Sequence, residues 1–401
     1  MSGVAVVSHR TDVARMVAAG LSASLVGIGL SRFAYTPLIP ALVAAGWFTP
    51  ADTAYLGAAN LAGYLAGALA ARHLAAWRSP QSILRAMLVV ATVSFFACAV
   101  PFSFAWFLAW RLVSGVAGGA LMVLAAPTVL PHVPTQRRGL ASGIIFAGVG
   151  LGIAASGLLV PPLLARGLVE AWCGLGALAA VLTLVAWNGW PPPAALPVVR
   201  RPQMAQRPPS VTLKALYVEY ALNAVGLVPH MVFLVDFAAR GLGQGLDTGA
   251  HYWVLFGLGA TVGPVLAGVL ADRIGFGSAL RVAFLIQAAA IGLIAIPSGA
   301  AGLVASSLIV GAFVPGIVPL VLGRTQELVA DADGRRSAWS SATTAFAIGQ
   351  AVAAYAFSFL FERSHNHVML FELGAGALVL ALVIDLVAAR SRRTLVVRSN
   401  S

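Results

Sequence analysis

The chain has 401 residues, of which 60% are hydrophobic and 9% are charged. A soluble domain carries about a quarter charged residues, so this composition excludes an ordinary soluble protein and favours apolar helices in a lipid bilayer. The net charge of +12 would suit a nucleic-acid partner or the basic cytoplasmic face of a membrane protein, and the placement of the basic residues decides between them.

Apolar segments follow one another along the chain, separated by short polar, proline or glycine breaks. We interpret twelve of them as transmembrane helices and expect an all-α membrane protein. In chain order they cover residues 16–42, 53–74, 82–100, 104–130, 139–164, 168–190, 213–239, 250–271, 278–296, 302–322, 338–361 and 368–389. The first is longer than the apolar core of about 7–15 residues in a signal peptide, so we expect it to be retained.

One segment, 191–212, interrupts this series. It is both proline-rich and basic, a composition that cannot span a bilayer. We predict a cytoplasmic linker here, between an N-terminal six-helix bundle, 1–190, and a C-terminal six-helix bundle, 213–401. Its prolines are Pro191, Pro192, Pro193, Pro197, Pro202, Pro208 and Pro209.

The basic residues are distributed unevenly between the loops. With a cytoplasmic N-terminus, 20 of the 25 Lys and Arg residues lie in inside segments or at the cytoplasmic ends of spans, 3 lie outside and 2 lie deeper within spans. Lys and Arg accumulate on the cytoplasmic side of membrane proteins. We therefore expect both termini in the cytoplasm, and we expect no nucleic-acid partner.

The two halves repeat each other. Gly67-Ala-Leu-Ala-Ala-Arg72 closes the second span and Gly268-Val-Leu-Ala-Asp-Arg273 closes the eighth, an offset of 201 residues (268 minus 67). Arg137-Arg138 and Arg335-Arg336 precede the fifth and eleventh spans, an offset of 198 (335 minus 137). Six spans separate each pair, so the orientation is unchanged and the repeat runs parallel about the membrane normal.

These motifs resemble those of the major facilitator superfamily. The second copy, Gly268–Gly275, is similar to the family's G-x-L-a-D-R-x-G signature, whereas the first copy has Ala71 in place of the aspartate. Arg111-Leu-Val-Ser-Gly115 is similar to the family's R-x-x-x-G element in the fourth span. The fifth span has a glycine ladder, with Gly148 and Gly152 at close-packing spacing, but not the G-P-x-x-G-G pattern of drug–proton antiporters.

Segments 27–40, 139–153 and 346–350 more narrowly resemble the bacterial YbfB/YjiJ-type branch of this superfamily. The resemblance implies two six-helix bundles that rock about a site at the bilayer midplane. It also implies a multi-pass protein of the bacterial inner membrane. We expect a monomer, with no cofactor and no metal.

Two cations within spans are the first candidate site residues. An ionisable side chain at membrane depth is costly, so it is a functional candidate by default. Arg32 lies in the first span and Arg111 in the fourth, and no N-half span carries a carboxylate in its middle. Two guanidinium groups facing one cavity would bind an anion, with Tyr35 one turn beyond Arg32. Alternatively, Arg111 has a structural role, anchored on backbone carbonyls or on a carboxylate of the C-terminal half across the cavity.

The C-terminal half supplies the candidates for proton coupling. Glu219 and His230 lie in the seventh span and Glu372 in the twelfth. A buried carboxylate can carry a proton, and histidine titrates near neutral pH. The alternatives are a carboxylate paired with a loop arginine and a histidine hydrogen-bonded in the core. For gating we single out the charged residues near span ends, Arg72, Asp236, Asp272 and Arg273.

Further polar residues lie within spans and are candidate substrate contacts, although hydrogen bonds between helices are the alternative for each. They are Asn60, Tyr64, Asn223, Gln350 and Tyr355.

We predict a secondary transporter that moves a small organic anion by proton symport, with sodium as the alternative ion. No Walker sequence is present to bind ATP, and no catalytic grouping indicates an enzyme. Two alternatives stay open. One is an exporter of cationic or neutral drug-like compounds, and the other is a transporter-like sensor or scaffold without net flux.

Overall fold

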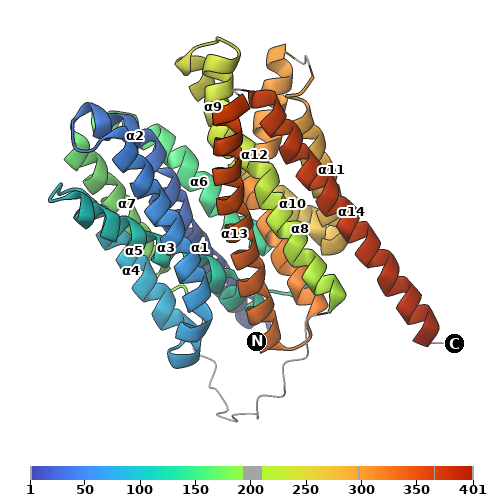
Figure 1. The fold of residues 1–401 in the computed structure, drawn as a ribbon. Helices are drawn as coiled ribbons and strands as arrows, with labels where there is room; N and C mark the ends of the chain where they lie inside the picture. The colour runs from blue at the N-terminus through green and yellow to red at the C-terminus, as the bar shows by residue number, and fades with distance from the viewer. Residues whose placement is uncertain (1, 193–209, 297–298, 365, 400–401) are drawn as a thin grey trace. The chain divides into compact units, whose positions relative to one another are not determined.

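The computed structural model describes residues 2–192, 210–296, 299–364 and 366–399, and all regular elements among them are helical. The chain divides into two compact units, Met1–Pro197 and Val198–Ser401, which we call the N-terminal and C-terminal units. In Figure 1 the first runs from blue to green and the second from yellow-green to red. Most of the predicted linker lies outside the described residues.

The N-terminal unit contains six spans. The first combines α1 (Ser2–Ser24), a π-helical segment η1 (Leu25–Phe33) and α2 (Tyr35–Ala44). The others are α3 (Pro50–Trp77), α4 (Pro80–Cys98), α5 (Phe104–Val129), α6 (Arg138–Leu164) and α7 (Leu168–Trp187), with short 3-10 turns η2 (Leu130–His132) and η3 (Thr135–Arg137) between α5 and α6.

The C-terminal unit repeats this order. Its first span combines α8 (Val211–Val228), π-helical η4 (Pro229–Phe233), α9 (Leu234–Asp236) and π-helical η5 (Phe237–Gly241). The others are α10 (Leu246–Ile274), α11 (Phe276–Gly292), α12 (Gly299–Leu328), α13 (Ala332–Ser364) and α14 (His367–Ser399).

Ten of these helical segments are long and apolar enough to cross a membrane, judged over the described residues. The 28-residue α3 and the 17-residue α11 complete two sets of six.

Serine and threonine caps set the start of several helices. Thr49 accepts a hydrogen bond from the backbone N–H of Asp52 (3.1 Å), and the Asp52 carboxylate accepts one from the Thr49 N–H (3.0 Å). This reciprocal capping box satisfies backbone donors that the first turn of α3 leaves open. The side chains of Ser79, Ser103 and Ser210 each accept one hydrogen bond from a backbone N–H in the first turn of α4, α5 and α8.

Glycines hold two helix pairs in close contact. A Cβ atom at Gly63 or Gly67 of α3 would collide with the backbone of α5, and one at Gly115 would collide with the backbone of α3. The C-terminal unit has the same contacts between α10 and α12, at Gly259, Gly263 and Gly311, each 196 residues later (259 minus 63). Small residues four apart allow such close packing, so these contacts align the two units residue by residue.

The glycine ladder of the fifth span packs as the sequence predicts. A Cβ atom at Gly148 would lie 2.9 Å from the backbone nitrogen of Leu25, and Gly152 meets the backbone of Gly29. These contacts bring α6 against η1. In the C-terminal unit, Gly349 of α13 similarly meets the backbone of Ala221 in α8.

The first span of each unit contains π-helical turns, in η1 and again in η4 and η5. Such turns are rare and occur often at functional sites. In η4 the cause is visible in the sequence, because Pro229 has no N–H to donate to the preceding turn. Arg32 lies in η1 and His230 lies in η4.

Candidate functional site

Arg111 lies inside the N-terminal unit and contacts the first span. Its side chain is 3% exposed, its Nη1 donates to the carbonyl of Ser31 (2.7 Å), and its guanidinium carbon lies 4.1 Å from the ring centre of Tyr35. Asn60 of α3 donates to the Arg111 carbonyl (3.2 Å). Three predicted site residues, Tyr35, Asn60 and Arg111, therefore meet where the first, second and fourth spans pack together.

Arg32 has a different environment from Arg111. It is half-buried, its guanidinium carbon lies 5.3 Å from the ring centre of Phe33, and it interacts electrostatically with the buried Tyr64 of α3. Arg111 contacts the carbonyl of Ser31, the residue before Arg32. The side chains of Ser31 and Arg32 leave the helix in different directions because the two residues are neighbours in the chain.

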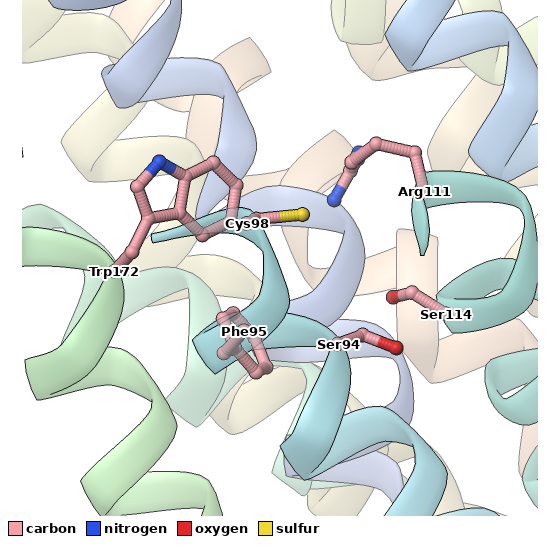
Figure 2. Close-up of a pocket in the computed structure, with 6 residues that line it drawn as sticks. All are labelled: Ser94, Phe95, Cys98, Arg111, Ser114 and Trp172. Atoms are coloured by element: carbon pink, nitrogen blue, oxygen red, sulfur yellow. The ribbon is translucent and has the colours of Figure 1, made fainter. Parts of the chain in front are cut away.

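A small pocket lies beside Arg111, between α4, α5 and α7 (Figure 2). Figure 2 shows the Arg111 guanidinium pointing toward the sulfur of Cys98. The pocket has room for about one particle the size of a water molecule. The pocket is too small for an organic solute, and Arg32 does not line it. Its lining residues are Ser94, Phe95, Cys98, Arg111, Ser114 and Trp172.

His230 is fully buried and takes part in a hydrogen-bond chain. Its Nε2 lies 2.8 Å from the Oγ of Ser306, which in turn donates to the carbonyl of Ala290 (2.6 Å). Because Ser306 has one hydroxyl proton and gives it to a carbonyl, the Nε2–H of His230 must be the donor to Ser306. Nδ1 then carries a lone pair, and it has no hydrogen-bond partner among the described residues.

Asn223 is fully buried and forms a second hydrogen-bond chain. Its Nδ2 donates to the Oε1 of Gln287 (2.9 Å), and Nε2 of Gln287 donates to the carbonyl of Ala283 (3.2 Å). Gln350 of α13 contacts the sulfur of Met231 (3.3 Å). In this structure Asn223 and Gln350 therefore make hydrogen bonds between helices, which is the alternative to a substrate contact.

Glu219 lies in a charged cluster of the C-terminal unit. Glu219 is 2% exposed and Asp385 of α14 is 4% exposed. The Glu219 carboxylate interacts electrostatically with Asp385 and with Arg281 and Arg324. Arg281 forms an ion pair with Asp385. Glu219 itself has no hydrogen bond or ion pair within the described part of the chain.

Sequence reasoning missed several partners in these clusters. Asp385 lies near the end of an apolar span and Arg281 near the start of another, so neither stands out as a membrane-depth charge. Ser306 and Gln287 give weak signals, because single small or polar residues are common in such helices.

Other predicted site residues lie at the surface of their units. Glu372, a candidate for proton coupling, is exposed on its unit, because α14 turns the neighbouring Phe371 inward instead. Tyr355 is 73% exposed, and Asp272 and Arg273 are exposed as well. The side chains of Arg72 and Asp236 lie outside the described residues.

The two units differ at the position of Arg111. The offset of 196 that relates the glycine contacts places Arg111 opposite Ser307, next to Ser306. The fourth span thus contacts the first through a guanidinium group, whereas the tenth contacts the seventh through a hydroxyl group and an imidazole.

Comparison with known proteins agrees with this architecture. A family model described as "Uncharacterised MFS-type transporter YbfB" matches residues 24–386. The chain belongs to this family. It is therefore a multi-pass membrane protein and a major facilitator transporter, which confirms the predicted superfamily, its branch and the twelve-helix fold in two six-helix bundles.

Solved structures of several transporters share this fold. The fucose:proton symporter FucP of E. coli is 14% identical with a TM-score of 0.71, covering 94% of this chain and 98% of that one. The proton:xylose symporter XylE is 13% identical with a TM-score of 0.72, covering 94% and 95%. The human organic anion transporter MFSD10 (TETRAN) is 17% identical with a TM-score of 0.69, covering 94% and 99%. At such identities the likeness shows the fold alone. No curated protein sequence matches the chain.

Proposed function

We propose that this transporter moves a small organic anion, coupled to protons, by alternating access. One observation carries the proposal: charge inside the spans is divided between the units. The spans of the N-terminal unit carry Arg32 and Arg111, and its three acidic residues, Asp12, Asp52 and Glu170, all lie near the ends of spans. Buried Glu219 and Asp385 lie in the C-terminal unit. One unit is suited to hold an anion, and the other to hold a proton.

Within this proposal, Arg32 is the substrate contact. It is half-buried in the first span, and it lies in a π-helical segment of the kind found at functional sites. A carboxylate would accept two parallel hydrogen bonds from it. Tyr64, which interacts electrostatically with Arg32, is the second proposed contact. Arg111 is not assigned to the substrate, because its pocket is too small.

Glu219 is the proposed proton carrier, with His230 and Glu372 as the alternatives. Glu219 is buried without an ion pair in the described chain, a setting that allows a carboxyl group to gain and lose a proton. The distribution of basic residues supports both termini in the cytoplasm, and the proposal includes a monomer in the bacterial inner membrane.

Direct binding and flux measurements test this function. Purified protein in proteoliposomes is given radiolabelled mono- and dicarboxylates, with and without an inward proton gradient. We expect gradient-driven uptake of at least one of them. Arg32→Gln should weaken its binding by about 10- to 100-fold, the loss of a charge-assisted hydrogen bond, and Arg32→Lys should restore part of it.

The matched control is Arg166→Gln, which removes an exposed arginine between α6 and α7 and should leave binding unchanged. Carboxylate binding that is insensitive to Arg32→Gln would refute the assigned contact. Efflux of lipophilic cations without carboxylate uptake would favour the exporter, and binding without flux would favour the sensor.

A further inference from the structure

The pocket beside Arg111 lies wholly within the N-terminal unit and is lined by hydrogen-bond donors and aromatic rings. Arg111 is 3% exposed and Trp172 is 1% exposed. The walls come from α4, α5 and α7. No carboxylate lines it, so the guanidinium group faces a space without an acidic partner.

Arg111 has an unused donor at this pocket. Its Nη1 is bound to the carbonyl of Ser31, but its Nε–H has no hydrogen-bond partner among the described residues. Figure 2 shows the guanidinium group directed at the thiol of Cys98 across the space. A buried charged donor without an acceptor is unfavourable, so this geometry indicates a missing acceptor.

The other polar groups of the pocket also favour an acceptor. Ser114 accepts a hydrogen bond from Asn60 Nδ2 (3.5 Å), which leaves its own O–H to donate into the space, and the Cys98 thiol is a weak donor. Ser94 uses its O–H on the carbonyl of Val90 (2.7 Å) and contributes no donor. Trp172 and Phe95 close the wall with their rings, whose edges carry partial positive charge.

From this arrangement we infer that the pocket is a resident site for one monoatomic anion, a halide such as chloride, held by Arg111, Ser114 and Cys98. Its size admits one particle about as large as water. Water would fit as well, but it cannot neutralise the buried guanidinium charge. The halide stays in the N-terminal unit and is not the transported solute, so the inference does not depend on the proposed function.

Halide titration of the purified protein tests the site. Thermal unfolding is followed in sodium bromide, chloride and gluconate at constant ionic strength. Bromide and chloride should raise the Tm saturably, as a ligand of the folded state does, and gluconate, which is too large, should not. Crystals grown in bromide should show an anomalous diffraction peak between Arg111, Ser114 and Cys98.

The two cysteines provide matched variants. Cys98→Leu fills the pocket and should abolish the halide-dependent rise in Tm, whereas Cys98→Ser keeps a donor and should preserve it. Cys173→Leu alters a cysteine outside the pocket and should also preserve it. The inference is overturned if bromide gives no anomalous peak in the wild-type pocket, and a pocket that holds water instead is one such result. It is also overturned if the halide-dependent rise in Tm survives Cys98→Leu.

Discussion

Buried polar side chains in the C-terminal unit are organised as short chains that end on backbone carbonyls. His230 and Asn223 were identifiable from the sequence because both lie in the middle of an apolar span. Their partners, Ser306 and Gln287, were not, since hydrogen bonding between helices depends on which faces meet. The same limit applies to Arg111, whose contacts with Ser31 and Tyr35 come from another span.

Two adjacent serines allow a direct test of the His230 chain. Ser306→Ala should destabilise the protein by about 1–3 kcal/mol, because it leaves the Nε2–H of His230 and the carbonyl of Ala290 without partners. Ser307 is equally buried, but its Oγ has no hydrogen-bond partner among the described residues, so Ser307→Ala should be neutral or stabilising. Equal losses of Tm in detergent for the two variants would contradict the assigned chain.

Helix pairs are the next level of organisation. α3 packs on α5, and α10 packs on α12, through glycines that allow backbone-to-backbone contact. The spacing of four between Gly63 and Gly67 is visible in the sequence. Which helix they face is not, because the motif names no partner.

Gly115→Ala is expected to separate α3 from α5. The new Cβ would lie 2.9 Å from the backbone nitrogen of Tyr64, and overpacking of this kind costs about 1–3 kcal/mol. Gly157 offers the control, since nothing lies within 4 Å of a Cβ there. Gly157→Ala should be neutral or stabilising by up to about 1 kcal/mol, the difference in helix propensity. The comparison uses chemical unfolding in detergent, and similar stability of both variants would rule out the close contact as a constraint.

For the whole molecule, the spans could be predicted well because composition, proline breaks and arginine placement each depend only on neighbouring residues in the sequence. The predicted 104–130 and 168–190 agree with α5 and α7 to within three residues. The distribution of side chains between interior and surface was harder to predict. Glu219 and Glu372 look alike as acidic residues in apolar helices, yet one is buried and the other exposed.

Coupling is a property of the whole transporter, and Glu219→Gln should isolate it. Glutamine keeps the shape of the side chain but cannot bind and release a proton. We expect uptake driven by a proton gradient to be lost, while exchange of labelled for unlabelled solute continues. Glu372→Gln is the comparison, and it should leave both activities intact. If Glu372→Gln abolishes gradient-driven uptake and Glu219→Gln does not, the proton site has been assigned to the wrong carboxylate.

The π-helical turns of the first and seventh spans have a consequence for how these helices tolerate changes in length. A π turn holds one residue more than an α turn, so each such segment contains a surplus residue. Removing one residue from η1 would let the helix continue as regular α, and the residues beyond would keep nearly the same direction, because the surplus residue is held in the wider turn. The same deletion in the regular part of α1 would rotate everything beyond by about 100° relative to the part before it, and Tyr35 would turn away from Arg111. The π-helical segment is thus the one part of the first span where a residue can be lost without turning the aromatic ring of Tyr35 away from the buried arginine.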